Sequence, residues 1–256
     1  REPMAKGDMS ADAPHGKEAI DGSLRFVPSA EGPLWIWAHP DRSTAMSRRY
    51  IVSMDIGGRT PGADWSVISV IDRYWLAEGG EEECIATCRF HLDQDLAVWK
   101  AVQIAKYYCD ALLVVEANSL DDKGTEGDHS LTILDEIKGY YTNLYSRTDP
   151  QRIREGAPER YGFFTSSASK SDLVNQMNKR LRENGYIEHD ARALDEADTY
   201  EIKTDGSYGA VDGEHDDIYM SRAIALKASQ TTPPPAMILP RENTQPHDTL
   251  LTEASF

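Results

Sequence analysis

Four acidic residues lie where a metal-dependent reaction could be organised. Asp55 ends the apolar stretch "YIVSMD", Glu116 ends the apolar stretch "ALLVVE", and Asp216 and Asp217 form a pair within "GEHDDIYM". A carboxylate at the end of a buried segment is costly unless water or a cation compensates its charge. For any one of these acids taken singly, an exposed position beside a turn is the simpler interpretation.

Convergence of the acids would favour a metal site. In an open α/β sheet, ligands gather beyond the carboxyl ends of the strands, so Asp55 and Glu116 would lie side by side if their strands were parallel neighbours. The helix that follows Gly213 would then bring Asp216 or Asp217 into the same pocket. Converging carboxylates repel one another, and a hard divalent cation such as Mg²⁺ relieves that repulsion. Two such ions about 4 Å apart can activate a water and stabilise the leaving oxygen of a phosphodiester.

The elements that must position these acids follow from hydrophobic patterning. Short turns separate three predicted strands, which favours a three-strand antiparallel meander at residues 50–56, 65–72 and 83–90. A helix with Asp93 as its N-cap follows. The continuous apolar run at 111–116 is typical of a parallel strand covered on both faces. We therefore predict an α/β fold with a mixed sheet and helices on both faces.

Further helices and short strands complete the predicted core. Helices are predicted at residues 130–141, 170–185 and 213–228, and short strands at 143–146 and 161–164. In the first of these helices Leu131 is expected on the buried face. In the second, Ser169 or Ser171 is expected as the N-cap and Gly185 as the residue after the C-terminus.

The flanks are polar and rich in turn-forming residues. We predict an N-terminal extension or linker over residues 1–48, which includes an edge strand within 33–40. The core domain is expected at 49–228 and a flexible tail at 229–256, where prolines prevent a continuing helix. Because the sequence starts at Arg1 rather than Met, we expect a piece of a longer protein.

The charge distribution is uneven. The net charge of −16 argues against nucleic-acid binding by the chain as a whole, yet residues 147–182 hold eight basic and four acidic residues. This basic stretch can face phosphate groups, or it can be a solvated surface. The three cysteines have no zinc-site spacing and fit free thiols in a reducing compartment. No apolar run approaches the roughly 20 residues of a membrane span.

Taken in order, these segments resemble the nuclease domain of tailed-phage large terminases. The resemblance covers roughly residues 33–228 and rests on "YIVSMDIGG", "ALLVVEANS", "YGFFTSSASKSDLVNQMNKRL" and "GEHDDIYMSRAIAL". It implies a ribonuclease H-like fold and a metal-dependent DNA endonuclease that cuts concatemeric viral DNA during genome packaging. The expected cofactors are two Mg²⁺ or Mn²⁺ ions.

The resemblance also assigns roles to the acids. Asp55 is expected to bridge both metals, Glu116 to be the second ligand and Asp217 the third, with Asp216 secondary. His215 is expected either as an auxiliary group that approaches the second metal or the phosphate, or as a surface residue at the start of a helix. The sequence does not decide which of Asp216 and Asp217 is the main ligand.

Basic residues are matched to the path of the DNA. Arg147, Arg152 and Arg154 lie where the family has a β-hairpin near the DNA, and Lys170 lies at a helix start where it could contact phosphate or remain solvated. The implied partners are double-stranded DNA read with little sequence preference, an ATPase domain of the same protein, the portal and the small terminase subunit, with no membrane. The implied location is the cytoplasm of an infected bacterial host.

One departure from the family is the absence of an ATPase motor. The chain has no G-x-x-x-x-G-K-[ST] sequence, so we expect it to supply only the nuclease part. Two alternatives remain: another ribonuclease H-like nuclease such as a Holliday-junction resolvase, and a non-catalytic domain that docks onto the packaging machine.

Overall fold

A mixed β-sheet lies at the centre of the computed structural model, which describes residues 1–60, 62–118, 133–204 and 206–238. The described residues form eight strands of this sheet. In spatial order the first seven are β2 (Arg25–Pro28), β1 (Ala5–Ser10), β3 (Leu34–Ile36), β7 (Glu82–Phe90), β6 (Ser66–Asp72), β5 (Tyr50–Asp55) and β8 (Leu112–Val115). The eighth, β9 (Tyr186–Ile187), pairs in parallel with the start of β7.

The predicted meander is confirmed. β5, β6 and β7 are consecutive antiparallel neighbours, and β8 joins β5 in parallel after the helical crossover. Short turns connect the antiparallel strands, whereas the parallel pair needs a long connection, as the chain order requires. This arrangement is the ribonuclease H-like α/β fold.

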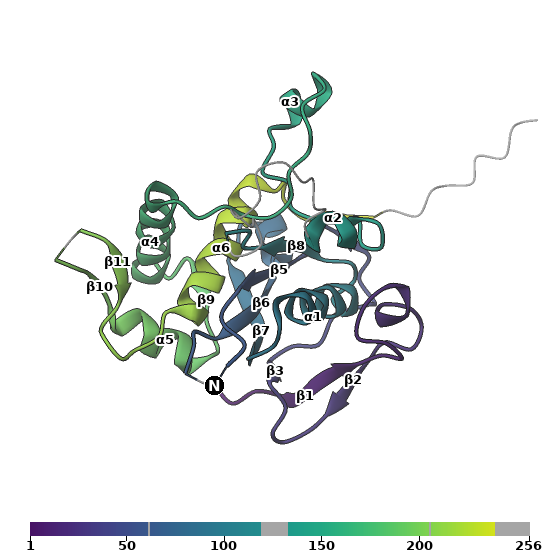
Figure 1. The fold of residues 1–256 in the computed structure, drawn as a ribbon, viewed down its shortest axis with the longest axis horizontal. Helices are drawn as coiled ribbons and strands as arrows, with labels where there is room; N and C mark the ends of the chain where they lie inside the picture. Colours follow the sequence, from purple (N-terminus) through teal and green to yellow (C-terminus); the bar gives the residue numbers. More distant parts are fainter. Residues whose placement is uncertain (61, 119–132, 205, 239–256) are drawn as a thin grey trace, which may run out of the picture.

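Helices cover both faces of the sheet (Figure 1). On one face, α1 (Gln94–Tyr107) packs against β5 and β8. On the other, α6 (Asp217–Thr231) packs against β5 and β6 and is itself covered by α4 (Ser167–Arg182) and α5 (Ala191–Asp198). The short helices are α2 (Ile133–Lys138) and α3 (Pro150–Arg154).

Side-chain alternation along β5 determines which face each residue joins. Val52 and Met54 belong to the apolar cluster on the α1 side, whereas Ile51 belongs to the cluster shared with α6. The Ser53 hydroxyl donates a hydrogen bond of 2.7 Å to the backbone carbonyl of Ser221 in α6. Because successive side chains point to opposite faces, the end of β5 directs residue 55 toward α6.

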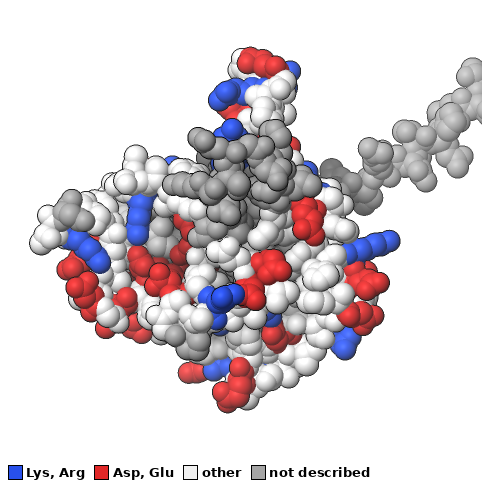
Figure 2. Space-filling view, in the orientation of Figure 1, with Lys and Arg blue, Asp and Glu red and all other residues white. Residues whose placement is uncertain are grey.

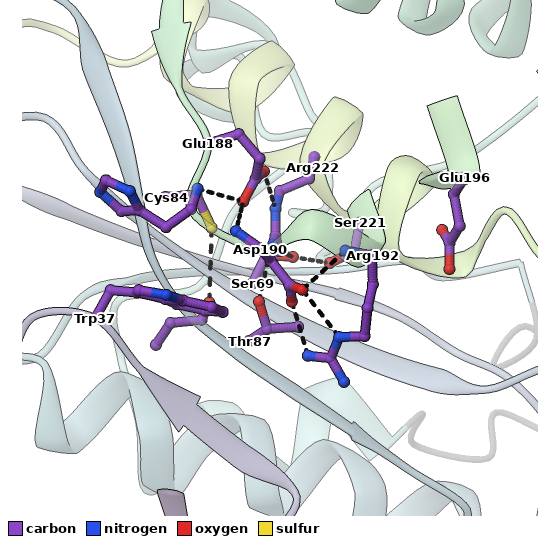
Figure 3. Close-up of polar contacts among 12 residues, drawn as sticks. Trp37, Ser69, Cys84, Thr87, Glu188, Asp190, Arg192, Glu196, Ser221 and Arg222 are labelled. Carbon is purple, nitrogen blue, oxygen red and sulfur yellow. Dashed lines mark hydrogen bonds and ion pairs between the residues drawn. The ribbon is translucent and has the colours of Figure 1, made fainter. Parts of the chain in front are cut away.

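A buried charge network fastens α6 to the sheet (Figure 3). Arg222 is fully buried and donates to Glu188 at 2.9 Å and to the Thr87 hydroxyl at 2.6 Å. Its guanidinium also donates to Ser69 and lies 3.9 Å from Asp190. A buried arginine is tolerated because several acceptors compensate its charge.

The N-terminal segment differs from the predicted linker. Residues 5–10 and 25–28 are strands of the main sheet. The edge strand predicted within 33–40 is the internal strand β3, paired with both β1 and β7. The strands at 5–10 and 25–28 were not predicted, because they are short and contain glycine, proline and polar residues that leave no clear hydrophobic period.

The ends of two helices also differ from the prediction. Ser166, rather than Ser169 or Ser171, is the N-cap of α4, and Ser169 completes a reciprocal capping box with it. Asn184 takes the left-handed backbone conformation expected of Gly185, with φ of 50°. The last helix extends to Thr231.

Two further regions bear on the prediction. Residues 236–237 of the predicted tail form β12 (Ala236–Met237), which pairs with β4 (Met46–Ser47). The predicted buried position Leu131 lies outside the described residues. Within the described parts of the chain, no helix is both long and apolar enough to cross a membrane.

Candidate active site

Asp55 and Glu116 are neighbours at the ends of two parallel strands. The β5–β8 register pairs Met54 with Val115, and the Glu116 amide donates to the Met54 carbonyl at 2.9 Å. Their side chains continue this register one step further, on the face covered by α6, so the two carboxyl groups lie next to each other. The expected proximity of these two acids is therefore observed.

Burial and the neighbouring acids strongly perturb the ionisation of Asp55. Burial raises the pKa of Asp55 well above its usual range, and the charge and hydrogen bond of Glu116 raise it further, followed by the charges of Asp217 and Asp216. Neighbouring carboxyl groups disfavour the charged form, and a bound divalent cation relieves that repulsion.

The start of α6 supplies the remaining predicted acids. Asp217 is the first residue of the helix and only 5% exposed, and its Oδ2 accepts a 3.1 Å hydrogen bond from the Trp65 amide. His215 Nδ1 lies 3.4 Å from the same oxygen. Burial raises the pKa of Asp217 to about 6 despite the lowering effect of the Trp65 amide, with further increases from Asp64 and Asp216.

Lys170 gives the acids a basic neighbour that the sequence analysis did not place there. Its Nζ lies 3.6 Å from Asp216 Oδ2, so the first turn of α4 contacts the start of α6. Asp216 occupies the N-cap position of α6 but makes no capping hydrogen bond with its own helix. Lys170, expected from the sequence to contact phosphate or to remain solvated, is thus paired with Asp216 in this structure.

The turn between β5 and β6 brings its backbone close to the end of β5. A Cβ atom added at Gly57 would lie 2.2 Å from the Asp64 carbonyl oxygen, so only glycine fits this approach. The turn places Trp65 beside α6, where its amide reaches Asp217. Trp65 is held in turn by a stacked His91 ring at 3.9 Å and by the Arg89 guanidinium at 4.4 Å.

The oxygen-rich donor set suits a hard divalent cation. Carboxylates are the preferred protein ligands of Mg²⁺, and no thiol or cluster of imidazoles competes for that role in the sequence around these acids. Among the described residues, no three His, Cys, Asp or Glu side chains are grouped tightly enough to hold one ion. In this arrangement Asp217 faces Trp65 and Asp216 faces Lys170, while Asp55 and Glu116 stand side by side at the ends of paired strands.

The predicted DNA-contacting arginines lie on a projection away from the main body (Figures 1 and 2). Arg152 and Arg154 belong to α3, and Asp149 caps that helix through the Gln151 amide. The Arg147 amide pairs with the Arg160 carbonyl at the base of the projection. A hollow of about 450 Å³ opens here, lined by Arg147, Thr148, Asp149, Arg152, Ala157, Pro158 and Arg160.

One acid near the site was missed by sequence reasoning. Glu196 of α5 is 7% exposed and accepts a 2.9 Å hydrogen bond from the Tyr219 amide in the first turn of α6. The sequence "DARALDEAD" does carry a helix signal, with Asp190 as the N-cap. No local pattern indicates that Glu196 turns toward a helix that begins about twenty residues later.

Comparison with known proteins identifies the fold. No protein family and no curated protein matches the sequence. The crystal structure of the large terminase nuclease from thermophilic phage G20c with bound magnesium is similar, with a TM-score of 0.51 and 20% identity over 78% of this chain and 89% of that one. Another crystal structure of the G20c large terminase nuclease has a TM-score of 0.50 and 18% identity over 78% of this chain and 90% of that one. The chain therefore has the fold of phage large terminase nuclease domains.

Proposed function

We propose that this chain is a divalent-metal-dependent DNA endonuclease, the nuclease part of a phage large terminase that cuts concatemeric DNA during packaging. The observation that carries the proposal is the adjacency of Asp55 and Glu116 at the ends of parallel strands, where the charges of Asp216 and Asp217 at the start of α6 also act on Asp55. The similarity to a terminase nuclease described with bound magnesium supports it.

The four acids have different roles in the proposed site. Asp55, Glu116 and Asp217 are the metal ligands, with Asp216 as a secondary one. When bound, two Mg²⁺ or Mn²⁺ ions supply Lewis-acid activation of the attacking water and charge stabilisation of the leaving oxygen. Lys170 balances the charge of Asp216, and His215, whose Nδ1 lies 3.4 Å from Asp217, would serve as an auxiliary group for the second metal or the phosphate.

DNA would be held largely through its phosphates. Arg147, Arg152 and Arg154 lie on a projecting segment that can reach a backbone at some distance from the acids. Such contacts position a duplex without reading its sequence. An ATPase domain of the same protein, the portal and the small terminase subunit are the proposed partners, and the cytoplasm of an infected bacterial host the proposed location.

The first test is plasmid nicking at low salt with Mn²⁺, Mg²⁺ or EDTA. We expect cutting with either metal, no cutting in EDTA and no cutting by Asp55→Asn, which removes a ligand charge but keeps the side-chain shape. Asp212→Asn is the matched control, because the Asp212 side chain is fully exposed and should not affect cutting. Full Mn²⁺-dependent activity in Asp55→Asn would refute the site.

A binding measurement separates the alternatives. A ligand that binds only the folded protein stabilises it by about 2.7 kcal/mol at a hundred times its Kd, so Mn²⁺ should raise the melting temperature of the wild type but not that of Asp55→Asn. No Mn²⁺ binding and no cutting would favour a docking domain. A strong preference for branched over linear DNA would favour a Holliday-junction resolvase.

A further inference from the structure

We infer that Glu196 is a positioning residue of this site: it caps α6 from the neighbouring helix and thereby keeps the Asp216 and Asp217 carboxylates free to face the metal and substrate. The inference rests on the proposed function. Three features of the start of α6 lead to it.

The first feature is the absence of a capping hydrogen bond from the Asp216 side chain at the start of α6. The first amides of a helix have no partner within the helix, and an aspartate at the N-cap normally supplies one. Asp216 stands at that position with no capping hydrogen bond, and its carboxylate faces Lys170 at 3.6 Å. Asp217 accepts from Trp65 instead. Both acids therefore point away from the backbone they would ordinarily satisfy.

The second feature is that Glu196, from the neighbouring helix α5, accepts a hydrogen bond from the first turn of α6. Glu196 Oε2 accepts a hydrogen bond of 2.9 Å from the Tyr219 amide, and the backbone amide of Ile218 also acts to lower the pKa of this carboxyl group. These are the third and second residues of α6, the positions whose amides an N-cap side chain reaches. Figure 3 shows Glu196 apart from the charge network around Arg222.

The third feature is the rigid support behind Glu196. α5 packs along α6, and Ala193 shares a buried apolar cluster with Ile218 and Val67. Asp190 caps α5 and is held by Arg192 at 2.7 Å. Glu196 therefore extends from a helix that is held in place by its N-cap and by buried packing against α6. Without it, Asp216 would be drawn back to cap its own helix, because that is the ordinary role of aspartate at this position.

Substitutions at Glu196 separate geometry from charge. Glu196→Gln keeps an acceptor oxygen at the same reach and loses the charge. Glu196→Asp keeps the charge, but its side chain is one methylene shorter. Glu196→Ala removes both the charge and the acceptor oxygens. Asp195→Ala is the matched control, since Asp195 is the exposed neighbour on the same helix. Mn²⁺ affinity is measured by calorimetry, and exchange of the Tyr219 amide by NMR in EDTA.

We expect Glu196→Asp and Glu196→Ala to weaken Mn²⁺ binding by about tenfold or more, the usual effect of losing a group that orients a ligand, while Glu196→Gln and Asp195→Ala remain near the wild type. The Tyr219 amide should exchange faster in the Asp and Ala variants even without metal. If Glu196→Ala fails to fold, the Asp and Gln variants still decide.

Three results have distinct meanings. Wild-type Mn²⁺ affinity in Glu196→Asp, or equal losses in Glu196→Gln and Glu196→Ala, would overturn the inference. Destabilisation with unchanged Mn²⁺ affinity would reduce Glu196 to a structural cap and would also overturn it. A wild type that binds no Mn²⁺ would instead refute the proposed function, and Tyr219 exchange in EDTA would then show whether the cap itself exists.

Discussion

The buried carboxyl group of Glu196 makes a measurable contribution to the pH dependence of stability. Burial raises its pKa from 4.5 to about 7, although the Tyr219 amide works in the opposite direction. Between pH 4.5 and about pH 7, Glu196 of the folded protein therefore keeps a proton that the same side chain has already lost in the unfolded chain. The resulting stabilisation is present in full below pH 4.5, declines as the pH rises, and is gone above about pH 7.

The size of this contribution follows from the shift. Each pKa unit corresponds to about 1.4 kcal/mol, so moving from about pH 5 to about pH 8 should cost the wild type on the order of 2.5 kcal/mol through this group. Glu196→Gln cannot titrate and should lack this loss. Other groups with raised pKa values, such as Asp217, remain in both proteins and largely cancel in the comparison.

The assay is urea unfolding of the wild type and Glu196→Gln in EDTA, at several pH values above the isoelectric point of about 4.8. The difference in unfolding free energy should grow in favour of Glu196→Gln as the pH rises. Asp195→Asn, an exposed change on the same helix, should follow the wild type. A difference that stays constant with pH would mean that Glu196 titrates normally, and the reasoning from its burial would be wrong.

Three further changes test other parts of the structure. Gly57→Ala should destabilise the fold by about 2 kcal/mol or more, because the added Cβ would lie 2.2 Å from the Asp64 carbonyl oxygen, whereas Gly22→Ala meets nothing within 4 Å and should change stability by less than about 0.5 kcal/mol in thermal unfolding. Arg222→Ala should cost about 3–5 kcal/mol in urea unfolding, because it leaves buried acids without their counter-charge; a loss below about 1 kcal/mol would contradict the network. Arg152→Ala should weaken binding to duplexes of different sequence equally and reduce the slope of log K against log salt by about 1, and an unchanged slope would remove this arginine from the DNA path.

Buried charged residues hold α6 at both ends and in the middle. Arg73 is fully buried and donates to the carbonyls of Ser229 and Thr232 at the end of the helix, at 3.2 and 2.9 Å. Glu196 accepts from the first turn, and Arg222 fastens the centre to the sheet. Because the helix carries two of the four proposed catalytic acids, its fixed position determines where they point.

Part of this arrangement could be predicted from the sequence. The strands that end near Asp55 and Glu116 and the helix that follows Asp216 have strong local patterns, since burial imposes a period on each segment. The sequence indicated a parallel strand at 111–116, but its pairing with the first core strand was only a condition for bringing Asp55 and Glu116 together, which the structure meets. The short strands at 5–10 and 25–28 could not be predicted, because their glycine, proline and polar residues give only a weak hydrophobic pattern.

The sequence by itself determined that the acids stand at the ends of buried elements, because patterning and chain order are local properties. Tertiary packing alone decided what each acid contacts. The pairing of Lys170 with Asp216, the approach of Trp65 to Asp217 and the capping of α6 by Glu196 join segments that are distant along the chain. Such contacts depend on how helices pack on the sheet, and short-range spacing carries no information about them.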